Sequence, residues 1–90
     1  MADATPTDAH AIALLALATA VSDERRARRF LDLTGIGTDE LRSRAAETAL
    51  LAGLLRFLEA HEPDLLAVSE AMDVKPELLV AARNELEGME

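Results

Sequence analysis

The chain has 90 residues, a mass of 9.7 kDa and a formal net charge of −8, which is enough for one small domain. Half of the residues are apolar, and 18 Ala and 16 Leu make up most of that half. Ala and Leu lead the scale of helix propensity, whereas strands favour β-branched and aromatic residues, so the composition excludes a β-rich fold. The absence of cysteine excludes disulfides, thiolate zinc sites and iron–sulfur clusters. The excess of 17 acidic over nine basic residues argues against a general nucleic-acid binder.

Residues 9–21 form an apolar run whose only polar side chains are His10 and Thr19. A membrane-spanning helix needs about 20 apolar residues, so the run is too short to cross a bilayer. The residues before it carry Asp3 and Asp8 and no Lys or Arg, which is the wrong charge for a secretory signal peptide. We therefore expect a cytoplasmic protein without a membrane segment.

Capping residues and helix stops divide the chain into short helical segments. Ser22 and Thr38 are expected to cap helices, and Gly35 is placed to end one in a left-handed conformation. We expect a flexible segment over residues 1–5 and helices at about residues 6–21, 23–33, 39–46, 48–61, 63–72 and 76–87. The short loops predict one all-α domain over residues 1–90, folded as a compact orthogonal bundle of five or six helices.

The first predicted helix has no polar stripe, because His10 and Thr19 fall on opposite sides of a helical wheel. A helix that is apolar all round is normally buried on most of its faces. We expect it to be the central helix of the domain or part of a dimer contact.

Arginines crowd the next predicted helix, where Arg25, Arg28 and Arg29 share one face. They are candidate partner-binding residues, because such a face can hold phosphates, an acidic peptide or nucleic acid. The acidic residues Glu24 and Asp32 each stand four positions from Arg28, which is the spacing of local ion pairs. We favour the interpretation that this face is solvated and locally paired.

Residues 69–83 resemble a helix-turn-helix, with Asp73 where the turn usually has glycine. A recognition helix places base-reading and phosphate-binding groups near its N-terminus, whereas Glu77 and Leu78 make this end acidic and apolar. The motif is also a common packing unit. A DNA-binding regulator is therefore kept as the alternative function.

Reactive side chains show little clustering along the sequence. His10 and His61 lie on different predicted helices, and His61 is expected in a last turn, where it interacts with the helix's negative end. The acidic group of Glu59, Glu62 and Asp64 has no calcium-type loop. We expect no enzymatic activity, no cofactor and no metal; an enzyme or metal binder requires a histidine to meet these carboxylates.

An ordered series of short motifs runs through the chain. It comprises Arg29-Phe30-Leu31-Asp32-Leu33-Thr34-Gly35, Asp39-Glu40-Leu41-Arg42, Leu50-Leu51, Leu54-Leu55-Arg56-Phe57-Leu58, His61-Glu62, Pro76-Glu77 and Ala81-Ala82-Arg83. With this series the chain resembles, over about residues 9–87, a family of short bacterial proteins known as domain of unknown function 3572. The resemblance implies an all-helical fold and a bacterial origin, and it carries no assigned activity.

The motif residues have physical roles that the structure can test. Phe30 and Phe57 are the chain's only aromatic residues and are expected to anchor the core, and Arg42 is expected to bond neighbouring helix ends. Together these observations favour a non-enzymatic interaction or adaptor module that self-associates. Its partner would be another protein or a second copy, with neither nucleic acid nor a membrane as a partner.

Overall fold

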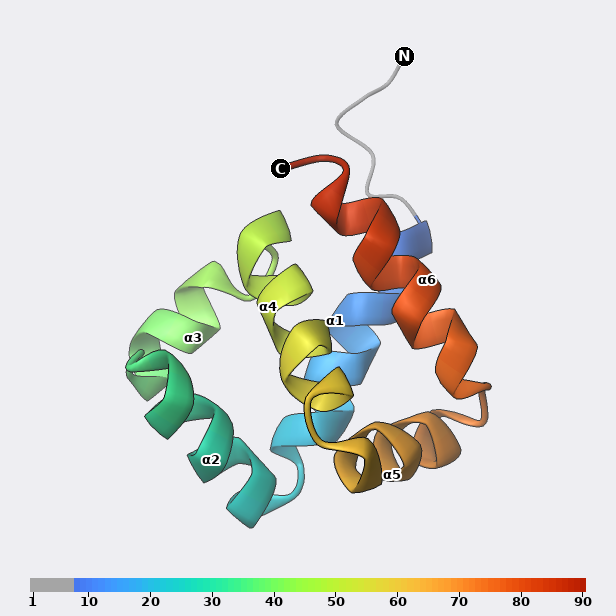
Figure 1. Cartoon of the computed structure of the whole chain (residues 1–90). Coiled ribbons are helices and arrows are strands. Elements are labelled where there is room, and N and C mark those ends of the chain that lie inside the picture. Colours follow the sequence, from blue (N-terminus) through green and yellow to red (C-terminus); the bar gives the residue numbers. More distant parts are fainter. Residues whose placement is uncertain (1–7) are drawn as a thin grey trace.

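The computed structural model describes residues 8–90. These residues form an all-α bundle, as predicted, and Figure 1 shows α1 passing behind α4 and α6. The helices are α1 (Asp8–Val21), α2 (Glu24–Thr34), α3 (Thr38–Arg44), α4 (Thr48–Glu59), α5 (Glu62–Met72) and α6 (Pro76–Glu87). The expected flexible segment 1–5 and the first two positions of the first predicted helix lie outside the described residues.

The centre of the bundle is α1, which contacts α2, α4, α5 and α6. Its buried residues are mostly small: Ala9, Ala13, Ala16 and Ala20, with Leu17. The facing helices supply large side chains, because Leu51, Leu54, Leu55, Leu58, Leu79 and Leu86 are fully buried. Small residues on one helix against large ones on its neighbours let the helices approach closely without voids.

The expectation that the first helix is central is confirmed, but one of its faces is not covered. Leu14 is 45% exposed and Leu15 is 55% exposed. The bundle surrounds α1 through its alanines and Leu17, and these two leucines remain about half exposed on the other side. The apolar wheel predicts burial on most faces, and this exposed face is the part of α1 to which the other expectation, a dimer contact, applies.

Two aromatic rings join α2 to α4. The Phe30 and Phe57 centroids lie 5.2 Å apart with an interplanar angle of 66°, which is an edge-to-face arrangement. Phe30 is buried and Phe57 is half-buried. The expectation that these two residues anchor the core is confirmed.

The junction of α1 and α2 differs from the sequence expectation in its cap. Asp23, rather than Ser22, caps α2 by accepting a hydrogen bond from the Arg26 N–H at 3.0 Å. This bond holds the pKa of Asp23 below its usual range. The Ser22 hydroxyl instead donates to the Thr19 carbonyl at 2.7 Å, so it completes α1.

Other helix ends shift by one or two residues. Gly35 ends α2 with φ 76°, as predicted, but Gly37 rather than Thr38 occupies the cap position of α3, because the helix already includes Thr38. The ends of α3 and α4 fall two residues earlier than expected. His61 therefore precedes α5 as its cap residue instead of closing α4.

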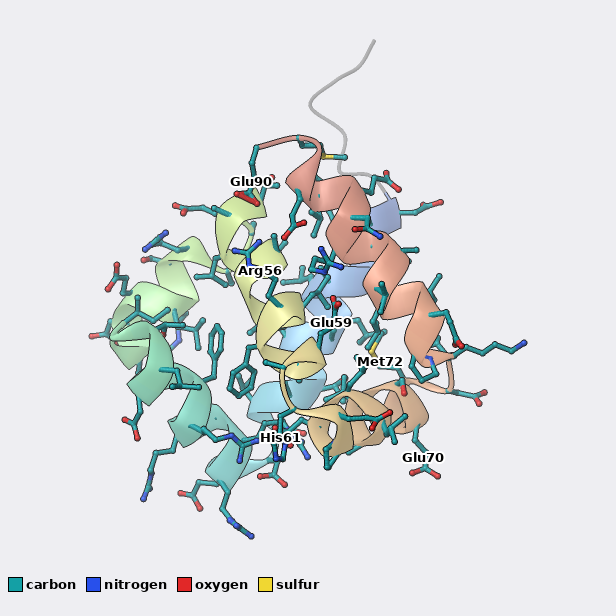
Figure 2. The ribbon with its side chains drawn as sticks, in the orientation of Figure 1. Arg56, Glu59, His61, Glu70, Met72 and Glu90 are labelled. Atoms are coloured by element: carbon teal, nitrogen blue, oxygen red, sulfur yellow. The ribbon has the colours of Figure 1, made fainter. Side chains whose placement is uncertain are left out.

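Ion pairs hold α4 against α6. Glu87 accepts from Arg56 at 2.5 Å and from Arg83 at 2.7 Å, and Arg83 also donates to Glu59. Figure 2 shows Arg56 and Glu59 on the side of α4 that faces α6. The hydrogen bond from Arg56, followed by the charge of Arg83, holds the pKa of Glu87 below its usual range.

Replacing Ala13 by leucine tests the close packing of α1. Ala13 is fully buried, so Ala13→Leu forces the neighbouring helices apart and is expected to lower the free energy of unfolding by about 1–3 kcal/mol. The control Ala81→Leu changes an exposed alanine in the middle of α6, outside the packed side of α1, and should shift stability by less than about 0.5 kcal/mol. Urea denaturation measures both, and equal effects would contradict the packing argument.

The dependence of stability on pH in the acidic range tests the contribution of Glu87. Because its pKa is lower in the folded protein, Glu87 contributes stability above its ordinary pKa of 4.5 and loses it as the pH falls through the folded value. Glu87→Gln should therefore be less stable at neutral pH and should lose less stability between about pH 6 and pH 3 than the wild type. Denaturation over this range, with the exposed Glu85→Gln as control, measures the difference. Parallel pH curves for wild type and Glu87→Gln would contradict it.

Candidate functional site

A buried carboxylate joins α2 to α5. Asp64 is 7% exposed, and its Oδ1 accepts from Arg26 Nε at 3.0 Å. Its Oδ2 pairs with Arg29 and lies 3.2 Å from His61 Nδ1, at the junction of α4 and α5 (Figure 2). A buried carboxylate is costly unless charged partners and hydrogen bonds surround it. The arrangement therefore fixes the position of α2 on the bundle.

The three arginines singled out in the sequence line one hollow of about 340 Å³ on α2, together with Glu24 and Asp32, and Arg29 also takes part in the α2–α5 contact. The Arg29 guanidinium pairs with Asp64 and lies 5.6 Å from the centroid of the Phe57 ring, so it is part of the α2–α5 contact. Arg25 and Arg28 are exposed, and neither makes an ion pair with another residue of the range 8–90.

Local pairing of Arg28 with Glu24 or Asp32, which the spacing predicts, does not occur within ion-pair distance among the described residues. Sequence reasoning also missed Arg26, because its main partner is 38 positions away. The sequence does show Asp64 in the first turn of a predicted helix, but it does not indicate which arginine this carboxylate contacts.

An apolar groove of about 470 Å³ runs between α1, α2 and α3. It is lined by Leu14, Leu17, Ala18, Val21, Ala27, Leu31, Thr38, Leu41, Arg42 and Ala45. No residue of α3 is buried; Leu41 of α3 and Ala45, which follows the helix, are half-buried at this groove. One side of the bundle is thus an open apolar surface between helices.

Arg42 stands at the edge of the groove. Its side chain is 78% exposed and pairs only with Asp39, at 3.7 Å, among the residues that the structure describes. The expectation that it bonds neighbouring helix ends is wrong, because α3 packs through Leu41 and Ala45 and turns Arg42 toward solvent.

The exposed face of α1 continues this groove. We use the name α1 face for Ala11, Leu14, Leu15 and Ala18, all of which are exposed. Leu14 and Ala18 also line the groove, so the two surfaces are contiguous. The sequence has no charged residue between Asp8 and Asp23, so the α1 face is apolar along its whole length.

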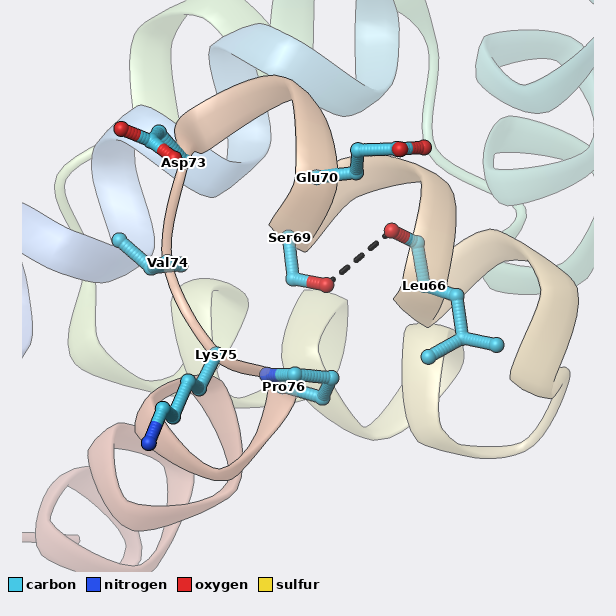
Figure 3. Close-up of a pocket in the computed structure, with 7 residues that line it drawn as sticks. All are labelled: Leu66, Ser69, Glu70, Asp73, Val74, Lys75 and Pro76. Atoms are coloured by element: carbon cyan, nitrogen blue, oxygen red, sulfur yellow. Dashed lines mark hydrogen bonds between the residues drawn. The ribbon is translucent and has the colours of Figure 1, made fainter.

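A second hollow, of about 680 Å³, lies in the corner between α5 and α6 (Figure 3). Asp73 turns this corner with φ 59°, a left-handed conformation that aspartate tolerates better than most residues. Inside the corner, the Ser69 hydroxyl donates to the Leu66 carbonyl at 3.1 Å (Figure 3). The hydroxyl is thus bonded within its own helix.

The two histidines have different surroundings. His10 Nε2 lies 2.9 Å from the Thr48 hydroxyl and so joins α1 to α4. His61 lies beside Asp64, so the contact between a histidine and a carboxylate that an enzyme or metal binder requires is present, at a hollow of about 190 Å³. Glu59 pairs with Arg83, whereas Asp64 pairs with Arg26 and Arg29, so the two carboxylates belong to different ion pairs. Within residues 8–90, no three His, Asp or Glu side chains are grouped so that they could hold a metal ion. None of the helices in that range is both long and apolar enough to cross a membrane.

The fold and its surface define a small acidic all-α protein with an apolar helix face beside an apolar groove. The family model described as Protein of unknown function (DUF3572) matches residues 6–89, and the chain belongs to that family, as its motifs predict. No curated protein and no solved structure matches the chain. The description assigns no activity, so the family gives no mechanism.

Removing the charge of Asp64 tests the α2–α5 contact. Asp64→Asn leaves two arginines beside a neutral amide, and we expect the free energy of unfolding to fall by about 2–3 kcal/mol. Asp32→Asn removes an exposed charge from α2 and should change stability by less than about 0.5 kcal/mol. Thermal and urea denaturation measure both variants. A loss for Asp64→Asn no larger than for Asp32→Asn would show that Asp64 does not hold α2.

Proposed function

We propose that the protein is a non-enzymatic interaction module that self-associates through the α1 face. The observation that supports this most directly is the exposure of Leu14 and Leu15 on the central helix, 45% and 55%, beside an apolar groove. Isolated exposed leucines are common on protein surfaces, but a contiguous apolar surface of several helices is typical of an interaction site.

The absence of charge on the α1 face favours a second copy as its partner. The centre of a protein interface is depleted in charged residues, and in a twofold dimer the same patch lies on both sides. An apolar patch without charges is complementary to a second copy of itself, as a twofold dimer requires. A partner of another sequence would not require the patch to be self-complementary. A dimer would also bury the leucines that this small bundle leaves in contact with water.

DNA binding by residues 69–83 has less support. Arg83, the basic residue of α6, forms ion pairs with Glu59 and Glu87. Exposed residues of α6 include Glu77 and Glu85, whose charge repels phosphate. A DNA-binding regulator is therefore the second candidate function. For either function, we propose a cytoplasmic location in a bacterial cell.

The state of association in solution tests the proposal. Size-exclusion chromatography with light scattering, over a range of protein concentrations, is expected to give a dimer for the wild type. Leu15→Glu places a charge in the α1 face and should weaken the dimer by at least about tenfold. Leu33→Glu changes the most exposed leucine, which lies on α2 outside the α1 face and the groove, and should leave the dimer unchanged.

Two results would contradict the proposal. One is a wild-type protein that stays monomeric at the highest concentration. The other is a dimer that Leu33→Glu weakens as much as Leu15→Glu does, because the contact would then not depend on the α1 face.

A further inference from the structure

We infer that the second copy pairs with the first through antiparallel α1 helices, with the twofold axis between Leu14 and Leu15. This inference rests on the proposed function, because it specifies the partner and its orientation at the same surface. It assigns a role to Asp8 and Arg28, which neither the core nor the α2–α5 contact uses.

The α1 face is symmetric along the helix. Ala11 and Ala18 are two turns apart, and Leu14 and Leu15 lie midway between them, at the midpoint of α1 (Asp8–Val21). In an antiparallel pair, Ala11 of one copy faces Ala18 of the other at both ends of the contact. The two alanine pairs allow close approach of the helices, and the four leucines gather around the axis.

Symmetry of the apolar residues does not by itself exclude a parallel pair, but the charges at the two ends of α1 do distinguish the orientations. The first residue, Asp8, is exposed and acidic, and this end of α1 lies beside the C-terminal half of α6 with its exposed Glu85 (Figure 1). The other end of α1 leads into the first turns of α2, where Arg25 and Arg28 are exposed.

Arg28 lies on the exposed polar side of α2, where it lines a hollow with Glu24, Arg25 and Asp32. In the sequence it is next to Ala27 and one turn from Leu31, both of which line the groove that α1 borders. It makes no ion pair within the described chain, and its neighbour Asp23 is already engaged by Arg26. A second copy lying antiparallel on the α1 face brings its Asp8 toward this arginine, and the twofold axis repeats the pair.

A parallel arrangement has the opposite electrostatic result. It places Asp8 beside the Asp8 of the second copy and the arginines of α2 beside their own copies. Like charges that face each other across an interface disfavour that orientation. The macrodipoles of the two α1 helices also oppose each other favourably only when the helices are antiparallel.

Cysteine cross-linking tests the orientation cleanly, because the chain has no cysteine of its own. Ala11→Cys and Ala18→Cys are made as separate proteins at exposed positions and oxidised alone and as an equal mixture. The antiparallel pair requires Cα atoms about 4.4–6.8 Å apart between residue 11 of one copy and residue 18 of the other, so the mixture should form a disulfide-linked mixed dimer. Each protein alone should remain largely unlinked.

Charge reversal supplies the second arm. Asp8→Arg and Arg28→Asp should each weaken the dimer about threefold to tenfold at low salt, and the double variant should recover the wild-type dissociation constant. The control Lys75→Glu, at the exposed corner before α6, should have no effect. All of these positions are exposed, and circular dichroism confirms that each variant keeps its helical fold.

Failure of the inference is distinct from failure of the proposed function. Cross-linking of Ala11→Cys or Ala18→Cys alone, as fast as in the mixture, would establish a parallel pair and overturn the inference. A dimer that persists in light scattering without any cross-link, or whose charge variants do not compensate each other, would also overturn it. In those cases self-association stands, whereas a monomeric wild type overturns both.

Discussion

Close approach of α1 to its neighbours is the constraint on which the rest of the structure depends. A chain of this length has little surface to bury, so its stability requires dense packing around one central element. Alanines supply the contact side of α1, and the leucines of α4 and α6 fill the space in front of them. Larger residues on α1 would move both neighbours outward and open the core that they share.

The same constraint produces the exposed α1 face. Because small residues point toward the core, the larger Leu14 and Leu15 are left on the side that no helix covers. Covering them within the chain would require α3 to pack across α1, but α3 has no buried residue and ends after two turns. The protein thus combines a well-packed centre with an apolar surface that its own helices do not close.

Local features of the fold could be predicted from the sequence, and the reason is physical. Helix propensity, proline at a first turn and glycine in a left-handed stop act over a few residues, so α6 and the end of α2 were placed correctly. The cap of α2 does not follow from the sequence in this way, because Ser22 and Asp23 are adjacent and both can accept a backbone hydrogen bond. In the structure the Ser22 hydroxyl donates to the Thr19 carbonyl at the end of α1, and Asp23 caps α2.

The arginines of α2 show why the site was harder to predict than the fold. An arginine side chain is equally suited to a buried carboxylate, an aromatic ring or a distant anion, and spacing alone cannot separate these partners. In the folded chain, Arg26 and Arg29 pair with Asp64, whereas Arg28 lies on the exposed side of α2 with Arg25. The helix therefore divides one basic run into a structural side and an exposed side. That division follows from where α5 begins, since the carboxylate of Asp64 reaches only the arginines that face it.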